Sequence, residues 1–272
     1  MTVVNEALYK RLADAIEAYP SAVVAYSGGV DSTLVAHVTT QVLKQRCLVV
    51  TGVSPSLSKS ERALAKETAV KLGFQHRWVE THELDRPGYR ANTGDRCYFC
   101  KSELFERLHT LAQSEGYDVV LSGDNLDDVA PNTHRPGMRA AQEWQVQKPL
   151  IDAAFTKQDV RELAAQLGLP NAKKIASPCL ASRVPHGLKV DETVLKKIES
   201  AEAVLRQFGF DEFRVRHHGH LARLEVPAKD ISRVLEVRVA LYEAVRSVGY
   251  LWVSLDLREF RSGSLNISLN KE

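Results

Sequence analysis

The segment AVVAYSGGVDS, residues 22–32, constrains the fold more than any other part of the chain. It opens with five apolar or aromatic residues, as in a strand buried on both faces, and closes on polar residues that begin a helical pattern. Glycines between the two let backbone N–H groups turn toward a ligand, and a helix N-terminus adds positive potential. The segment therefore predicts a strand–loop–helix unit in which the loop and the start of the helix form an anion site, with Ser27, Gly28, Gly29, Asp31 and Ser32.

Two common phosphate-binding loops do not match this segment. It lacks the Gly-Lys-Ser/Thr ending of a Walker A loop and the G-x-G-x-x-G spacing of a dinucleotide fold. The simplest alternative is an ordinary strand–turn–helix unit in which Asp31 only caps the helix.

The first half of the chain alternates between short apolar runs rich in β-branched residues and helical patterns. After the strand at 22–26, these segments occupy 32–45, 47–53, 58–72, 75–79, 100–115 and 119–122. Strands that alternate with helices predict an α/β fold, a parallel sheet with helices on both faces. Such a sheet binds its ligands beyond the carboxyl ends of its strands.

The second half follows another pattern. Residues 124–155 show no strong period and predict a long loop with a short helix. After a helix at 156–167 and a Pro-rich loop come a helix, two alternating runs around a turn, a helix and a strand, at 191–207, 213–226, 228–246 and 250–257. We expect two domains, residues 1–187 with the parallel sheet and residues 188–272 as a small α+β domain.

Charge and hydropathy exclude several classes of function. The 272 residues include 36 Lys and Arg and 34 Asp and Glu, a balance that argues against a nucleic-acid-binding protein, although 213–223 is locally basic. No apolar run approaches the ~20 residues of a membrane span. The first twenty residues carry charges throughout, unlike a signal peptide. We expect a cytoplasmic protein with no membrane and no nucleic-acid partner.

Two of the four cysteines, Cys97 and Cys100, lie within GDRCYFC. In a reducing compartment a Cys-x-x-Cys pair more often binds metal or takes part in catalysis than forms a disulfide. With Cys179, the pair could form a zinc site that a histidine such as His186 completes. The cysteines could also act as a dithiol that passes on a persulfide. The spacing could also be a coincidence. Cys47 lies within an apolar run and is expected to be a small buried hydrophobic residue.

SGGVDS, residues 27–32, resembles the SGGxDS signature of the PP-loop ATP pyrophosphatases. The resemblance implies that the loop holds the β- and γ-phosphates of ATP and that Asp31 helps to organise Mg²⁺ and the phosphates. A substrate oxygen would attack the α-phosphate, and a nitrogen or sulfur nucleophile would then displace AMP. GVSPS at 52–56 would border adenine through Ser54, and LSGDNLDD at 121–128 resembles a second nucleotide motif that contains Gly123 and Asp124.

Three later stretches, RPGMRAAQEW, ASPCLASRVPHG and LREFRSGSLN, resemble the LarE family of sulfur transferases in nickel-pincer nucleotide cofactor biosynthesis. The resemblance runs from the phosphate loop to Asn266. It implies adenylation of the carboxylates of pyridinium-3,5-biscarboxylic acid mononucleotide and replacement of oxygen by sulfur. It also implies a sulfide or sulfur-donor protein as partner, contact with other enzymes of the same biosynthesis, and a homo-oligomer, possibly a hexamer.

LarE proteins are of two kinds, and the cysteines of this chain match the second. The first kind gives up the sulfur of one cysteine and works once, whereas the second holds a 4Fe-4S cluster on three cysteines and carries a sulfide on the unligated iron. Here the three would be Cys97, Cys100 and Cys179. The alternatives are a sacrificial Cys179, a PP-loop tRNA thiolase, an ammonia-using synthetase and a nucleotide sensor without catalysis.

The resemblance also implies substrate contacts in the C-terminal half. They fall on Ser182, Arg183, Arg214, Arg216, Glu225, Arg261 and Ser262. Without the resemblance, Arg214 and Arg216 are equally well explained as solvated residues on one face of a strand, and Glu225 as a surface residue. Arg135 is a weaker candidate for a phosphate contact. The nearby histidines are expected in a turn or on the surface, at positions 217, 218 and 220.

Overall fold

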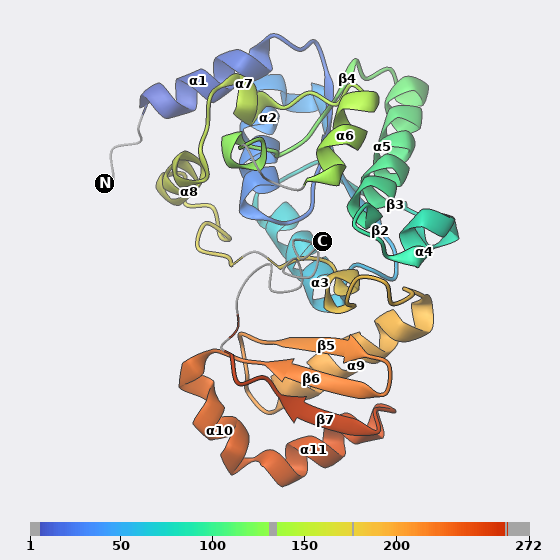
Figure 1. Ribbon diagram of the computed structural model, residues 1–272. Coiled ribbons are helices and arrows are strands. Elements are labelled where there is room, and N and C mark those ends of the chain that lie inside the picture. Colours follow the sequence, from blue (N-terminus) through green and yellow to red (C-terminus); the bar gives the residue numbers. More distant parts are fainter. Residues whose placement is uncertain (1–5, 131–134, 176, 259, 261–272) are drawn as a thin grey trace. The chain divides into compact units, whose positions relative to one another are not determined.

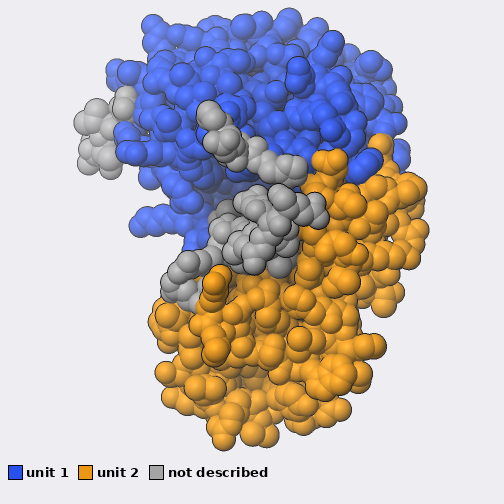
Figure 2. Space-filling view, in the orientation of Figure 1, with its two compact units in different colours: residues 1–83, 97–177 blue, residues 84–96, 178–272 orange. Residues whose placement is uncertain are grey.

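The computed structural model describes residues 6–130, 135–175, 177–258 and 260 (Figure 1). The chain forms two compact units, which Figure 2 colours separately. Unit 1 combines residues 1–83 with 97–177, and unit 2 combines residues 84–96 with 178–272. Each unit is described by itself, and the boundary at residue 187 between folding domains stays a prediction.

Unit 1 contains a sheet of four parallel strands in the order β3-β2-β1-β4. The strands are β1 (Ala22–Ala25), β2 (Cys47–Val53), β3 (His76–Glu80) and β4 (Val119–Leu121). Because β1 lies between β2 and β4, the strand order reverses beside β1, and the loops that follow β1 and β4 meet at this switch point. Ligands bind at such a point in open parallel sheets.

Helices cover both faces of the unit 1 sheet, because the side chains of β1 pack alternately into two apolar clusters. Ala22 and Val24 pack into one apolar cluster, and Val23 and Ala25 into another. The first cluster includes residues of α1 (Glu6–Glu17), α2 (Val30–Leu43), α3 (Lys59–Lys71) and α8 (Lys157–Gln166). The second includes residues of α5 (Arg96–Glu115) and α6 (Pro136–Glu143). The prediction of a parallel sheet with helices on both faces is confirmed.

Residues 124–155, for which we expected one short helix, contain α6 and α7 (Pro149–Asp152). Each begins with a proline, whose fixed φ angle and missing N–H suit the first helical position. The helix that follows begins with a capping box, in which Thr156 and Asp159 exchange side-chain and backbone hydrogen bonds.

Unit 2 contains a three-stranded sheet in the order β5-β6-β7. β5 (Arg214–His218) and β6 (Leu221–Glu225) form an antiparallel hairpin whose turn contains Gly219 at φ +66°, and β7 (Trp252–Leu255) pairs parallel to β6. The helices are α4 (Pro87–Ala91), α9 (Glu192–Gln207), α10 (Ile231–Glu236) and α11 (Arg238–Ser247). The single helix predicted for 228–246 is wrong, because the chain leaves helical geometry at Val237, which packs against the core between α10 and α11.

Among the helices that the structure describes, none is both long and apolar enough to cross a membrane.

Candidate active site

The loop after β1 is tightly held, and no described side chain caps the helix that follows it. Gly28 has φ +73°, and a Cβ there would lie 3.0 Å from the Ala65 Cβ of α3. Ser27 N donates to Ser32 Oγ at 3.2 Å, and Ser32 Oγ donates to Gly29 O at 3.1 Å. Gly29, the N-cap of α2, makes no side-chain cap hydrogen bond. The first N–H groups of α2 therefore have no side-chain cap and are suited to an anion.

A prediction follows for Gly28. Gly28→Ala is expected to destabilise the protein by about 1–3 kcal/mol and to weaken ATP binding, because alanine disfavours this φ and its Cβ meets α3. Gly73→Ala is the matched control, since Gly73 has φ +67° with nothing within 4 Å of its added Cβ. Its cost should be only that of the backbone conformation, about 1 kcal/mol. Unfolding midpoints and ATP titrations measure both effects, and equal results for the two variants would contradict the prediction.

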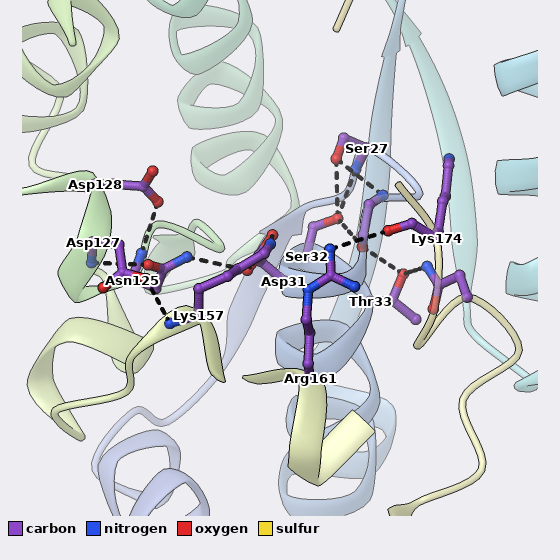
Figure 3. A network of polar contacts seen from close by, with 12 residues as sticks. Ser27, Asp31, Ser32, Thr33, Asn125, Asp127, Asp128, Lys157, Arg161 and Lys174 are labelled. Atoms are coloured by element: carbon purple, nitrogen blue, oxygen red, sulfur yellow. Dashed lines mark hydrogen bonds and ion pairs between the residues drawn. The ribbon is translucent and has the colours of Figure 1, made fainter. Parts of the chain in front are cut away.

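Asp31, in the first turn of α2, is the point on which three segments converge (Figure 3). Asn125, from the loop after β4, donates its Nδ2 to Asp31 Oδ1 at 3.1 Å. Lys157, the first residue of α8, donates Nζ to Oδ1 at 2.7 Å and to Oδ2 at 2.5 Å. The side chains of the ion pair are 34% and 23% exposed, so both charges remain accessible. The site thus combines a carboxylate suited to Mg²⁺ with an ammonium suited to phosphate.

The second predicted nucleotide motif lies against the phosphate loop. A Cβ at Gly123 would lie 2.7 Å from Ser32 N, so only glycine allows the loop after β4 to pass this close to the start of α2. Asp124 accepts a hydrogen bond from Ser122 Oγ at 2.6 Å. The structure therefore brings Gly123 together with the phosphate loop.

Ser54 follows β2 at the carboxyl edge of the same sheet. Its hydroxyl donates to Glu83 Oε1 and accepts from Ser56 N at 3.2 Å. Glu83 is 2% exposed, and its Oε2 has no hydrogen-bond partner among the described residues. Sequence reasoning missed this buried carboxylate, because no local motif marks it.

The outer side of the phosphate loop is held by residues from the end of unit 1. Asn171 Nδ2 donates to Gly28 O at 3.0 Å and to Thr33 Oγ1 at 2.7 Å. Lys174 Nζ donates to Gly28 O at 3.2 Å and to Glu61 Oε2 at 2.6 Å. Because a peptide is planar and trans, fixing the Gly28 carbonyl also fixes the direction of the next N–H. Neither residue was predicted from the sequence, since both lie over 140 positions from Gly28.

Unit 2 gathers the predicted arginines around two buried glutamates. Arg183 binds Glu202 through Nε at 2.8 Å and Nη2 at 3.2 Å, and both side chains are under 5% exposed. Arg216 binds Glu225 through Nε at 2.9 Å and Nη2 at 2.7 Å, and its Nη1 donates to Ser182 O at 2.8 Å. The solvated alternatives for Arg216 and Glu225 are therefore wrong. Glu202 was not predicted.

Arg214 lies beside these pairs on β5. Burial, followed by the positive charge of Arg183, lowers the pKa of the Arg214 guanidinium to about 10. Burial is the larger of these two causes, because removing the guanidinium from water disfavours its charged form.

The prediction that the three nearby histidines lie in a turn or on the surface is wrong for His217. It is 7% exposed, its Nδ1 lies 3.0 Å from the Tyr250 hydroxyl, and burial is the main cause that lowers its pKa to about 4. His218 is half-buried and accepts from Arg223 Nε at 3.2 Å, whereas His220 is exposed.

The cysteines differ in exposure. Cys97 and Cys179 are exposed, Cys100 is partly exposed, and Cys47 is buried with a thiol pKa raised to about 11, mainly by burial. Cys97 and Cys100 lie three positions apart near the start of α5 and so share one side of the helix. Cys179 precedes the 3-10 turn Leu180–Arg183 in unit 2.

Within the described residues, no group of three or more His, Cys, Asp or Glu side chains is arranged to hold a metal ion.

Arg135 forms a 2.8 Å ion pair with Asp128. Two predicted contacts, Arg261 and Ser262, lie outside the described residues.

Comparison with known proteins agrees with this architecture. The family model described as asparagine synthase matches residues 4–239. An uncharacterised protein of Synechocystis sp. is 43% identical over 92% of this chain and 93% of its own length. The pyridinium-3,5-bisthiocarboxylic acid mononucleotide synthase of Lactiplantibacillus plantarum is 35% identical over 91% of this chain and 90% of its own length. The chain therefore belongs to the LarE family, within the ATP-using PP-loop ATP pyrophosphatases.

Proposed function

We propose that the chain is an ATP-dependent sulfur transferase that converts pyridinium-3,5-biscarboxylic acid mononucleotide to the bis-thiocarboxylic acid. The observation that carries the proposal is the 35% identity to the synthase named above, over nine tenths of both chains. The phosphate loop, with Asp31 and Lys157 at the switch point, supports the ATP half of the reaction. The three accessible thiols support the sulfur half.

In the adenylation step, an oxygen of the substrate carboxylate attacks the α-phosphate of ATP and pyrophosphate leaves. The N–H groups at the start of α2 and the Lys157 ammonium bind the β- and γ-phosphates, where negative charge grows. Mg²⁺, which the Asp31 carboxylate would hold, supplies charge neutralisation for the leaving group. The product is an acyl adenylate, whose AMP is a far better leaving group than the original carboxylate oxygen.

The buried arginines of unit 2 support binding of an anionic substrate. Arg214 and Arg216 alternate along β5, and the Arg183 charge is close enough to Arg214 to lower its pKa. We assign an anionic group of the mononucleotide to this cluster, with Ser182, Glu225, Arg261 and Ser262 as further contacts.

The number and the chemistry of the accessible cysteines fit a three-thiolate site. Asn92 Nδ2 donates to Val184 O, Pro185 O and Leu188 O at 3.3, 2.7 and 2.8 Å, all within unit 2. Asn92 precedes Cys97 by five positions, and Val184 follows Cys179 by five. The segment before Cys97 and the segment after Cys179 are therefore hydrogen-bonded to each other within unit 2. A 4Fe-4S cluster on Cys97, Cys100 and Cys179 would supply one open iron position for a sulfide.

A sulfide source or sulfur-donor protein, other enzymes of the same biosynthesis and assembly as a homo-oligomer belong to the same proposal. Their support is the family relationship.

The test combines metal analysis with a turnover assay. Anaerobically purified protein is expected to contain about four irons per chain with acid-labile sulfide, and to release pyrophosphate only when the pyridinium dicarboxylate is added. Zinc without iron would indicate a structural site, and loss of hydrogen sulfide from Cys179 by mass spectrometry would indicate a sacrificial cysteine. Absence of substrate-dependent pyrophosphate release would contradict the proposed function itself.

A further inference from the structure

Arg96, the first residue of α5, is a buried arginine of unit 2 whose side chain has few polar contacts. The residue is 7% exposed. Its Nη1 donates to Asn92 Oδ1, and among the described residues this is the only polar contact of the side chain. Arginine has five N–H donors, so most of its hydrogen-bonding capacity is unused.

No described carboxylate neutralises this charge. Buried arginines are normally paired with an acidic group, since an uncompensated buried charge is costly. The first turn of α5 contains no acidic residue. Asp95, the preceding residue, forms no ion pair with Arg96 among the described residues. The N-terminus of this 20-residue helix adds further positive potential.

Asn92 has a fixed position, because its side chain and its backbone are both hydrogen-bonded to neighbouring residues. It is fully buried, has φ +53°, and uses its amide nitrogen on three carbonyl oxygens. Its own carbonyl accepts a hydrogen bond from Gly187 N at 3.1 Å. Asn92 therefore fixes the position of the Arg96 guanidinium, whose other donors have no partner among the described residues.

We propose that Arg96 is an oxyanion-binding residue for the substrate, and that it receives a carboxylate or phosphate group of the mononucleotide. The planar guanidinium fork matches either group in a two-point hydrogen bond. Arg96 also directly precedes Cys97 in the chain. The inference rests on the proposed function for the identity of the ligand, but not for the presence of an anion site.

The test compares wild type with Arg96→Gln and Arg96→Lys. Arg90→Gln is the matched control, because Arg90 is an exposed arginine on the same segment. Titration calorimetry measures the affinity of each protein for two probes. Mg²⁺ and a non-hydrolysable ATP analogue are present to occupy the phosphate loop. Nicotinic acid mononucleotide has a ring carboxylate and a phosphate, whereas nicotinamide mononucleotide has only the phosphate.

Arg96→Gln is expected to weaken nicotinic acid mononucleotide binding about 10- to 100-fold, as for the loss of a charge-assisted hydrogen bond. Arg96→Lys keeps the charge without the fork and should weaken it less. If only the acid probe is affected, the ligand is the carboxylate; if both are affected, it is the phosphate. Arg90→Gln should bind like wild type.

Thermal unfolding in phosphate and in chloride at equal ionic strength, with the ATP analogue present, separates this inference from the proposed function. Phosphate should stabilise wild type more than Arg96→Gln, even if wild type binds neither mononucleotide and the proposed substrate is wrong. The inference would be overturned if wild type and Arg96→Gln bound each probe with the same affinity and were stabilised equally by phosphate. A lower unfolding midpoint with unchanged anion binding would also overturn it, since Arg96 would then only support Asn92.

Discussion

Replacing Asp31 with alanine is expected to lower substrate-dependent pyrophosphate release by at least about 1000-fold. The Asp31 carboxylate accepts from Lys157 and Asn125, so its loss removes the group on which the three segments converge. It also removes the expected ligand of Mg²⁺. Asp31→Asn should lose nearly as much, because it keeps the shape of the side chain but not the charge that binds a divalent cation.

The experiment measures pyrophosphate release and bound iron on the same samples. Iron should be retained in both Asp31 variants, because the proposed thiolate ligands do not include this residue. Asp14→Ala, which removes an exposed carboxylate on α1, is the control and should leave both quantities unchanged. Wild-type rates in Asp31→Ala would contradict the assignment of this residue. Loss of both pyrophosphate release and iron would show that the two functions are not separable as proposed.

Replacing any one of Cys97, Cys100 and Cys179 with alanine is expected to abolish iron binding and repeated sulfur transfer. A cubane with one open iron needs three thiolates, and two leave it without a stable set of ligands. Adenylation should survive, so pyrophosphate release in a single turnover should stay within a few-fold of wild type. This combination distinguishes loss of the sulfur carrier from general damage to the protein.

Cys47→Ala is the matched control for the cysteine series. Cys47 is 1% exposed within β2, so its replacement should cost stability of about 1 kcal/mol while iron and turnover remain. Full iron content in all three single variants would rule out the cluster. If only Cys179→Ala stopped sulfur transfer, the sacrificial reaction would replace the cluster as the explanation.

The fold was predictable from the sequence because its signals are local. Each buried strand of unit 1 is a short apolar run, and the glycines of the phosphate loop lie next to each other. The parallel order then follows from alternation with helices. The break at Val237 was not predictable in this way, because the helical pattern continues through it and the core decides where the chain turns.

The missed site residues depend on long-range contacts. Lys157 is 126 positions from Asp31, and nothing beside it in the sequence distinguishes it from a surface lysine at the start of a helix. His217 was assigned to a turn or the surface because the histidine cluster has no recognisable ligand spacing, but Tyr250, 33 positions later, provides its buried partner. Such residues are identified by what the fold brings to them.

The ion pair between Lys157 and Asp31 has a consequence for the order in which ligands bind. A free Mg²⁺ ion would have to displace a tethered ammonium that already contacts both carboxylate oxygens. ATP that arrives with its own Mg²⁺ offers both partners a replacement at once, since the metal takes the carboxylate and the phosphates take the ammonium. The enzyme is therefore expected to bind the magnesium–nucleotide complex as one ligand, with little affinity for the metal alone.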